Sequence, residues 1–317
     1  MPKVPPGIRG AAITGWGTAL PDQVVTNHDL ERTLDTNHEW IVERTGIRER
    51  RVGGTTAGLS VEAGRKAIER AGLQPGDIDA LILATTTPDR VVPGTSSTVQ
   101  HALGLTCGAY DLNAACSGWV YGLVNAHGLI ALGAEKVLVI GTDTLARITD
   151  WDDRNTAILF ADGSGAAVLE AVEGSGQLLG WDLSADGSAE GALYAEVGGK
   201  LQMEGREVFR RAVRIMVESA TASMEAAGVT ADDLALVVPH QANIRIIAAS
   251  CERLGVELER ASIVLDRTGN TSAASIPLAL ADALDRGRIC EGDLVLFVGF
   301  GAGMTAASAV VRWSAPV

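Results

Sequence analysis

The chain of 317 residues lacks the long apolar runs that would place it in or across a membrane. No stretch approaches the roughly 20 uninterrupted apolar residues of a membrane span, so we expect a soluble globular protein. Residues 1 to 7, Met-Pro-Lys-Val-Pro-Pro-Gly, do not form the apolar core of a signal peptide. The expected location is therefore the cytoplasm.

Cysteine is scarce, and the spacing of the four residues excludes two further classes. Cys107, Cys116, Cys251 and Cys290 form no Cys-x-x-Cys pair and show no metal-like grouping with the five histidines. We therefore expect neither a disulfide framework nor a metal site.

Basic residues are also in deficit, with 26 Lys and Arg against 39 Asp and Glu, which gives a formal net charge of -13 at pH 7. This balance argues against general nucleic-acid binding, because phosphate neutralisation requires a basic surface. An anionic partner would need a local basic patch.

The residues that are present predict an α/β fold. Hydrophobic residues make up 47% of the chain, and there are 37 glycines, which is typical of one large domain or two smaller ones. Short apolar runs alternate with amphipathic stretches: we expect a strand over 80–84, a helix over 94–103 and a strand over 136–141. The strands are almost continuously apolar, so we expect helices on both faces of a layered sandwich.

A weak internal repeat indicates that the chain has two related parts. Residues 71–84 resemble residues 227–238, and residues 110–141 resemble residues 265–299, at similar offsets. The repeat predicts that the turns carrying Cys116 and Asn270 are equivalent. Chance similarity between two α/β stretches is the alternative.

Three short strings far apart in the chain carry the candidate chemistry: Asn-Ala-Ala-Cys-Ser-Gly at 113–118, Pro-His-Gln-Ala-Asn at 239–243 and Gly-Asn-Thr-Ser-Ala-Ala-Ser at 269–275. Each follows an apolar, strand-like run and is rich in small residues, so each can present a polar side chain at a strand end. They supply a nucleophile, a base and an amide: Cys116, His240 and Asn270.

Cys116 opens an apolar helical stretch over 117–132. Free backbone N–H groups and the positive end of the helix dipole would then favour its thiolate. The alternative is a small buried structural cysteine, and we interpret the other three cysteines in that way.

His240 follows the expected strand over 234–238 and a proline, which places its imidazole at the carboxyl edge of a sheet, where sites form. We interpret His28, His38, His101 and His127 as structural residues. Asn270 is an uncharged amide that can donate to an oxygen becoming an enolate. Its alternative role is to tolerate left-handed backbone geometry in a turn.

Further strings make the pattern specific: 39–42 (Glu-Trp-Ile-Val), 44–50 (Arg-Thr-Gly-Ile-Arg-Glu-Arg), 160–166 (Phe-Ala-Asp-Gly-Ser-Gly-Ala) and 299–303 (Gly-Phe-Gly-Ala-Gly). With them the chain resembles, almost end to end, the thiolase-like condensing enzymes and, within these, the β-ketoacyl-[acyl-carrier-protein] synthase III family. The resemblance implies a five-layer αβαβα sandwich of two halves. Residues 1–172 would carry the nucleophile, and residues 173–317 would carry the histidine and asparagine.

The resemblance also implies a reaction. Cys116 would take an acyl group from an acyl-CoA primer and condense it with malonyl-acyl carrier protein, giving a β-ketoacyl-carrier protein and CO2 in fatty acid or polyketide biosynthesis. His240 and Asn270 would stabilise the enolate without a metal or an organic cofactor, and the backbone N–H groups of Cys116 and Ala302 would form the oxyanion hole. Elongating members of the family use a second histidine in place of Asn270, so initiation is implied.

Further site residues follow from the same positional match. Trp40 and Arg154 would sandwich the adenine of coenzyme A, and the rest of its path would be lined by Thr36, Gly205, Phe209 and Asn243. A carrier protein would dock on Arg206, Arg210, Arg214, Arg245 and Arg253, although arginines at helical spacing are also typical of a solvated face. Glu252 stands where some relatives are basic.

The acyl pocket would be formed by Thr86, Val92, Leu145, Phe160, Leu193, Phe300 and Met304. Val92 falls where some relatives insert a phenylalanine across the interface of a homodimer, which the family also implies. The smaller residue predicts tolerance of primers larger than acetyl. The segment 187–202 is shorter than in several relatives.

Three alternatives remain open at this point. A relative of secondary metabolism would load the same cysteine and pass the acyl group to an alcohol or amine, or condense it with a non-malonyl partner. A papain-like protease also uses Cys, His and Asn, but the flanks of Cys116 do not match that family. A binding or scaffold protein would need an inert Cys116.

Overall fold

Two mixed sheets form the frame of the molecule in the computed structural model, which describes residues 8–314. The first sheet has the order β1-β7-β6-β4-β5, and its strands are Gly10–Ala19, Asp162–Val172, Lys136–Thr144, Ala80–Ala84 and Gly108–Leu112. The second has the order β11-β12-β13-β8, and its strands are Leu234–Pro239, Leu294–Gly301, Thr305–Arg312 and Leu178–Ser184.

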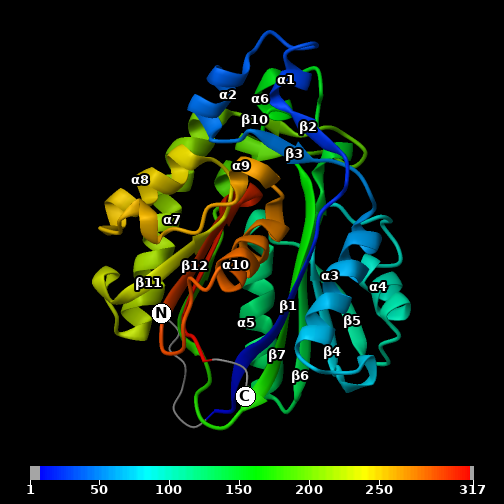
Figure 1. The fold of residues 1–317 in the computed structure, drawn as a ribbon, viewed down its shortest axis with the longest axis vertical. Coiled ribbons are helices and arrows are strands. Elements are labelled where there is room, and N and C mark those ends of the chain that lie inside the picture. Colours follow the sequence, from blue (N-terminus) through cyan, green and yellow to red (C-terminus); the bar gives the residue numbers. More distant parts are fainter. Residues whose placement is uncertain (1–7, 315–317) are drawn as a thin grey trace.

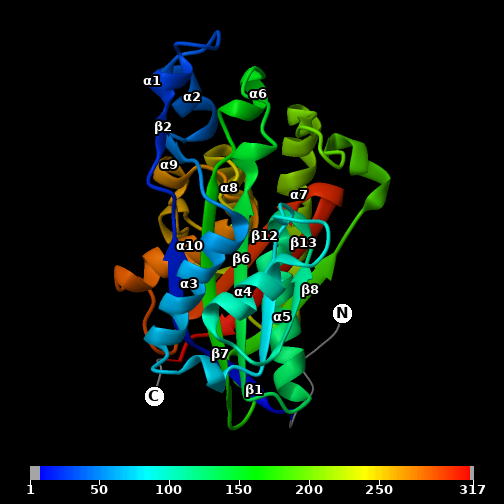
Figure 2. The same ribbon diagram turned by 90° about the vertical axis from the view of Figure 1, so that its right-hand side faces the viewer.

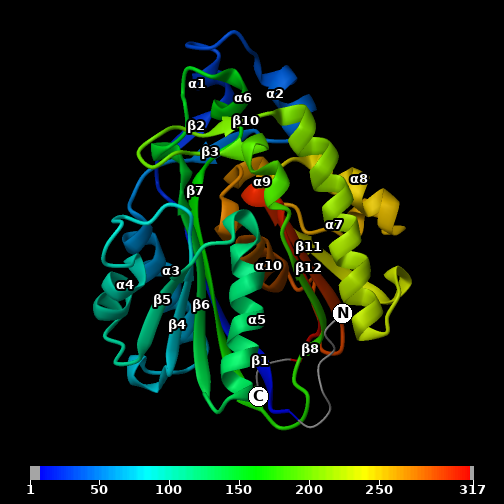
Figure 3. The same cartoon turned by 180° about the vertical axis from the view of Figure 1, so that it is seen from behind.

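Helices cover both faces of each sheet and complete five layers (Figure 1). The principal helices are α3 (Thr56–Arg70), α4 (Thr95–Leu103), α5 (Gly118–Ala131), α7 (Gly205–Ala227), α8 (Ile244–Leu254) and α10 (Ser275–Asp285). Figure 2 looks onto the outer layer of α3 and α4, and Figure 3 shows α5 in the layer that it shares with α10 between the sheets. The far outer layer is α7 with α8. The layered α/β sandwich that the apolar strands predicted is confirmed, since β12 is buried along its whole length.

The expected elements agree closely with those observed. The strand at 80–84 has the predicted bounds, and α4 begins at Thr95, one residue after the predicted start at Gly94. Strand β6 continues to Thr144, beyond the predicted end at Gly141. The last residues of β6 are polar, Thr-Asp-Thr, and they are buried by pairing with β7 rather than by apolar character.

The same pairing pattern recurs in both sheets. In the first, β1–β7 and β7–β6 are antiparallel, whereas β6–β4 and β4–β5 are parallel. In the second, β8–β13 and β13–β12 are antiparallel and β12–β11 is parallel. The fifth position is reduced to one parallel bridge between Val237 and Ala261. Because the two sheets use separate stretches of chain, this pattern supports our proposed division into halves at residues 172 and 173.

A small cap of short elements lies at one end of the layers (Figure 1). It contains β2 (Val24–Thr26), α1 (Asn27–Leu30), α2 (His38–Thr45), β3 (Glu49–Arg51), α6 (Arg154–Ala157) and β10 (Gln202–Met203), while β9 (Leu193–Tyr194) pairs with β10 and α9 (Leu265–Thr268) packs on β3. The fully buried Arg50 fastens the cap, since it donates to Val25 O, Asn27 Oδ1 and Ile158 O. Burial lowers the pKa of Arg50 to about 10. No helix within residues 8–314 is long and apolar enough to cross a membrane.

Candidate active site

One cavity of about 770 Å³ brings together the three residues singled out by the sequence, Cys116, His240 and Asn270. Cys116 lies in the turn after β5, His240 directly follows β11, and Asn270 lies in the turn before α10. None of the other four histidines lines this cavity.

Cys116 lies in a single 3-10 turn, Ala115–Ser117, directly before α5. The preceding Ala115 has φ of +48°, a left-handed conformation that is costly for a residue with a side chain. Burial is the main cause that raises the pKa of the Cys116 thiol to about 12; the nearby Asp143 carboxylate acts in the same direction, and a hydrogen bond with the Ser272 side chain acts against both. The resting thiol is therefore neutral, contrary to our expectation that the helix start would favour the thiolate, and its attack requires a base.

His240 is held from its backbone and from one ring nitrogen. Its N–H donates to Val298 O over 2.8 Å, its ring packs edge-on against Phe300, and its Nδ1 lies 2.6 Å from Ser275 Oγ. Burial lowers the pKa of His240 to about 3, so the ring is neutral near pH 7. Since the Ser275 hydroxyl can donate or accept, it supports either tautomer and leaves Nε2 as the chemically available nitrogen.

The side-chain amide of Asn270 is oriented by the turn around it. Its Oδ1 accepts from Ser272 N over 2.9 Å, so the Nδ2 donors remain for a ligand in the cavity. Its backbone bonds to Leu159 O and to Ala161 N, each over 2.9 Å, as a bridge beside Phe160. The left-handed residues of this turn are Gly269 and Ser272, so Asn270 is not needed for backbone geometry.

The predicted oxyanion hole lies where the chain at Gly301 approaches the nucleophile. A Cβ added to Gly301 would lie 2.6 Å from Cys116 N and 2.8 Å from the Ala115 Cβ. Gly301 is therefore required by space rather than by backbone conformation, since its φ of -157° is ordinary extended backbone. That the N–H groups of Cys116 and Ala302 share an oxyanion remains a proposal.

Strained backbone gathers at this site. Among residues 8–314, the non-glycine residues with positive φ are Ala115, Ser272 and Met304, which flank Cys116, Asn270 and Ala302 respectively. Each such residue costs on the order of 1–3 kcal/mol and persists only where its surroundings impose it. The strain in these three turns therefore lowers the stability of the folded protein.

The predicted coenzyme A residues line the same cavity, with one exception. Trp40, Arg154, Gly205, Phe209 and Asn243 line it, whereas Thr36 does not. The Thr36 hydroxyl is buried without a hydrogen-bond partner among the described residues.

The predicted adenine sandwich is closed in this structure. The Arg154 guanidinium carbon lies 4.8 Å from the centre of the Trp40 ring, which leaves no layer free for a planar base. Arg44 also stacks on Trp40, at 5.2 Å, and lines the cavity. Sequence reasoning missed Arg44, although its spacing of four residues from Trp40 on one helix is a usable signal.

The predicted acyl-pocket residues divide into two groups. Phe160, Leu193 and Phe300 line the cavity beside Cys116. The others do not line it: Leu145 and Met304 are buried in the core, Thr86 bonds to Asp143, and Val92 is 81% exposed at the surface. Their role in the pocket of a single chain is therefore not supported by their positions.

The predicted docking arginines fall on α7 and α8, and only some of them are free of acidic neighbours. Arg206 and Arg245 line the cavity. Arg210 pairs with Glu207, and Arg214 pairs with Glu218. These pairs weaken the positive charge of the predicted helix face, so the docking role remains a proposal.

The remaining cysteines are less uniform than we expected. Cys251 is buried, but Cys107 is only half-buried and Cys290 is exposed, because it lies in the turn that leads into β12. No group of three or more His, Cys, Asp or Glu residues within 8–314 could hold a metal ion.

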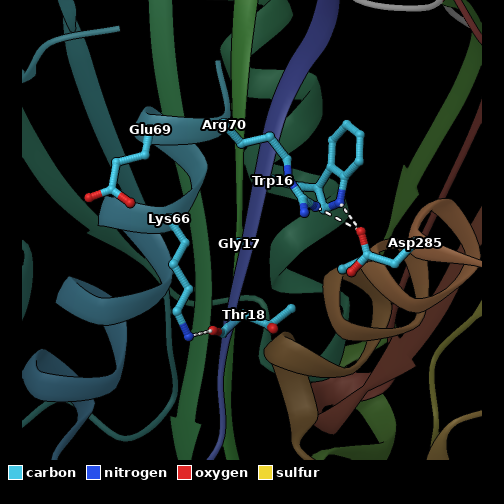
Figure 4. A pocket seen from close by; sticks show the side chains of 8 residues that line it. Trp16, Gly17, Thr18, Lys66, Glu69, Arg70 and Asp285 are labelled. Carbon is cyan, nitrogen blue, oxygen red and sulfur yellow. Dashed lines mark hydrogen bonds and ion pairs between the residues drawn. The ribbon is translucent and has the colours of Figure 1, made fainter. Parts of the chain in front are cut away.

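A second hollow of about 500 Å³ lies across α3, β1 and α10 (Figure 4). Asp285 accepts from Arg70 over 2.8 Å and from Trp16 Nε1 over 3.2 Å, and Lys66 donates to Thr18 O over 2.9 Å. These contacts tie α10 and α3 to β1, and Lys66, Arg70 and Asp285 are already engaged. This hollow therefore offers no chemistry comparable to that of the first.

Comparisons with known proteins agree with this geometry. Residues 110–187 match the family model for 3-oxoacyl-[acyl-carrier-protein (ACP)] synthase III, and residues 224–313 match the model for its C-terminal part. The chain is similar to β-ketoacyl-[acyl-carrier-protein] synthase III of Roseiflexus castenholzii, with 49% identity over 96% of this chain and 98% of the relative. It is similar to the same enzyme of Brucella suis, with 49% identity over 96% of this chain and 99% of the relative.

Solved structures give the same result. The fold is similar to that of 3-oxoacyl-[acyl-carrier-protein] synthase III from Aquifex aeolicus, with a TM-score of 0.94 and 42% identity over 96% of this chain and 100% of that one. It is also similar to the priming β-ketosynthase of the R1128 polyketide pathway, with a TM-score of 0.92 and 35% identity over 99% of both chains.

Proposed function

Since the chain belongs to the β-ketoacyl-[acyl-carrier-protein] synthase III family of initiating condensing enzymes, we propose that Cys116, His240 and Asn270 carry out its two-step reaction. The observation that carries this proposal is the meeting of a thiol with a neutral imidazole and an oriented amide in one cavity. The alternative transfer to an alcohol or amine is not favoured.

In the first step the Cys116 sulfur attacks the thioester carbonyl of an acyl-CoA. The sulfur–carbon bond of the acyl-enzyme forms, the bond to the coenzyme A sulfur breaks, and the thiol proton passes through neutral His240 to the departing sulfur. A base is needed because burial raises the pKa of Cys116 to about 12. The N–H groups of Cys116 and Ala302 stabilise the tetrahedral oxyanion.

In the second step malonyl-acyl carrier protein loses its carboxylate as CO2, and the bonding electrons enter an enolate. His240 Nε2–H and Asn270 Nδ2–H donate to the thioester oxygen that gains this charge. The enolate carbon then attacks the acyl-Cys116 carbonyl, the thiolate leaves, and it takes up one proton. Two neutral donors suit this step, since neither forms an ion pair with the malonyl carboxylate before it departs. We therefore propose that no metal or organic cofactor takes part.

The remaining members of the cavity wall are proposed to bind the substrates. Trp40 and Arg154 would take the adenine between them once Arg154 moves off the ring, and Phe209 and Asn243 lie along the path to Cys116. The exposed Arg206 and Arg245 stand at the same cavity and are proposed to receive the acidic carrier protein. We place the reaction in the cytoplasm.

We also propose that the enzyme works as a homodimer joined along β5. This strand is the last of its sheet, and Tyr110 on it is 40% exposed. Val91 and Val92, in the loop before α4, are 84% and 81% exposed. An open strand edge next to exposed apolar side chains favours pairing with a second copy. Sedimentation at several protein concentrations tests this directly.

The test of the proposed chemistry is mass spectrometry of the intact protein and its peptides after incubation with a panel of acyl-CoAs, followed by malonyl-acyl carrier protein. We expect an acyl adduct on Cys116 that the carrier protein converts to a β-ketoacyl product, and no adduct in the Cys116→Ala control. An adduct that persists through the chase would instead indicate an acyltransferase with another acceptor. The absence of any adduct would overturn the nucleophile.

A further inference from the structure

The turns that carry Cys116 and Asn270 share an asparagine side-chain hydrogen bond and a left-handed residue at equivalent positions. Asn113 Oδ1 accepts from Ala115 N over 3.2 Å, and Asn270 Oδ1 accepts from Ser272 N over 2.9 Å. Ala115 and Ser272 have φ of +48° and +52°. The spacing along the chain between Asn113 and Asn270 equals that between Ala115 and Ser272. The same spacing relates Cys116 to Ala273. The two halves therefore contain equivalent turns, which we call the active cradle, at residues 113–116, and the counterpart cradle, at residues 270–273.

The strand ends that face these turns correspond as well. Gly299 on β12 lies beside Cys116 O, and Gly141 on β6 lies beside Ala273 O, as the contacts of an added Cβ show. Two residues further along each strand stand Gly301 and Asp143. At Gly301 the space next to Cys116 N is kept free of any side chain.

At the counterpart position the Asp143 side chain fills that space. Its Oδ2 accepts from Ala273 N over 3.1 Å, which is the N–H equivalent to that of Cys116. The carboxylate thus binds the counterpart of one of the two proposed oxyanion donors, whereas the counterpart of the other, Thr144 N–H, donates to Thr87 Oγ1 over 2.8 Å. In the counterpart cradle, Ala273 stands at the position equivalent to Cys116, and the Asp143 carboxylate binds its N–H group.

The second oxygen of Asp143 binds a different part of the molecule. Its Oδ1 accepts from the N–H groups of Thr86 and Thr87 and from the hydroxyls of Thr85, Thr86 and Thr87, over 2.7 to 3.1 Å. These threonines directly follow β4, and the Asp143 side chain is fully buried. One carboxylate therefore connects the end of β4 in the first half to the Asn270 turn in the second.

We infer that Asp143 is a positioning residue for the condensation step, whose carboxylate binds the counterpart cradle and holds the strained Asn270 turn in register with Cys116. The inference rests on the proposed function of Asn270. Asp143 does not line the cavity, so it acts through the turn and not on substrate. Without this anchor, Ser272 is free to relax from its left-handed conformation, and the Asn270 amide turns away from the thioester oxygen.

The test compares Asp143→Asn with the wild type. The amide has the shape of the carboxylate, but it points an NH2 group either at the threonine donors or at Ala273 N–H, so donors face donors. We expect the condensation kcat to fall about 10- to 100-fold, as for a small displacement of a reacting group, with a smaller change in KM for malonyl-acyl carrier protein. Alkylation of Cys116 by iodoacetamide should become faster at a fixed pH, because removal of the Asp143 charge lowers the pKa of the thiol.

Opposite changes in condensation and alkylation distinguish positioning from structural damage, which would slow both together. Asp79→Asn is the matched control: Asp79 accepts from Glu135 N and Lys136 N at the other end of β6, so both rates should stay at wild-type values. If Asp143→Asn fails to fold, Thr87→Val provides the test of the inference. It removes one donor to the same carboxylate together with the acceptor of Thr144 N–H, and we expect slower condensation with unchanged alkylation.

A wild-type condensation rate in Asp143→Asn, or in Thr87→Val if only that variant folds, would overturn the inference. Parallel loss of condensation and alkylation with a lowered Tm would overturn it too. Failure of the proposed function gives a different result: the wild type itself would form no β-ketoacyl product, while the alkylation rates would still respond to Asp143→Asn.

Discussion

Replacement of Gly301 by alanine tests the oxyanion hole more sharply than removal of a side chain, because the donors are backbone N–H groups. The added Cβ would lie 2.6 Å from Cys116 N, 2.8 Å from the Ala115 Cβ and 3.0 Å from Thr305 Oγ1. The first of these contacts is with backbone, so either the turn at Cys116 or the strand end must move. Either movement removes the Cys116 N–H from the position of the acyl oxygen.

The magnitude follows from what one such donor contributes. Loss of a single oxyanion donor slows acyl transfer by roughly 10²- to 10³-fold, or about 2.7–4 kcal/mol in the barrier. Crowding of a packed segment costs a further 1–3 kcal/mol or so of folding stability. The φ of Gly301 adds nothing to this cost, since -157° is open to any residue.

The assay measures two reactions of the same thiol. Acylation by an acyl-CoA passes through an oxyanion, whereas alkylation by iodoacetamide does not. We expect Gly301→Ala to slow acylation by roughly 10²- to 10³-fold and to slow alkylation far less. Gly228→Ala is the control for stability alone, since Gly228 has φ of +71° with no heavy atom near the added Cβ and lies at the end of α7. If acylation and alkylation fell equally in Gly301→Ala, or if neither fell, the assignment of the oxyanion hole would be refuted.

Three further predictions concern Ser275, Asp162 and Val92. Ser275→Ala removes the partner of His240 Nδ1 and should slow decarboxylation of malonyl-acyl carrier protein about tenfold or more, with CO2 release as the measurement and an unchanged rate as the contrary result. Burial raises the pKa of Asp162 to about 6 from an ordinary 3.8, so its contribution to stability is complete below pH 3.8 and is lost as pH rises through 6. The free energy of unfolding of Asp162→Asn should therefore rise relative to the wild type by roughly 2 kcal/mol between pH 4 and pH 7, and parallel urea-melt curves would contradict this. Val92→Phe should reduce kcat/KM for isobutyryl-CoA relative to acetyl-CoA by about 10- to 200-fold, and a wild type that already rejects butyryl-CoA and isobutyryl-CoA would refute the role of Val92.

Much of the frame was predictable from local pattern. The continuously apolar strands indicated sheets covered on both faces, and the strand at 80–84 has the expected bounds. Cys116 and His240 were predictable because each follows a strand in a run of small residues. Asn270 was predicted from the same pattern, but the run before it is the short helix α9 and not a strand, and its turn still brings it to the same cavity.

Properties that depend on tertiary surroundings were not predictable in the same way. The helix start suggested a reactive thiolate at Cys116, but burial and the Asp143 charge reverse the direction of its pKa. Asp143 itself stood unnoticed beyond the predicted strand end at Gly141, because its partners come from the threonines after β4 and from a turn 130 residues away. Val92 was expected in an acyl pocket, yet a single chain leaves it exposed.

The reduced fifth strand of the second sheet bears on how two copies can pair. Ala261 and Ser262 cover the outer side of β11 with one bridge and one hydrogen bond to Val237, whereas β5 leaves the corresponding side of the first sheet open. An isologous contact between two β5 edges uses the same edge on both protomers and is closed by a twofold axis. At the corresponding edge of the second sheet, residues 8–314 form one bridge in place of a strand. In the homodimer that we propose, pairing along β5 would therefore use an edge that the second half does not repeat.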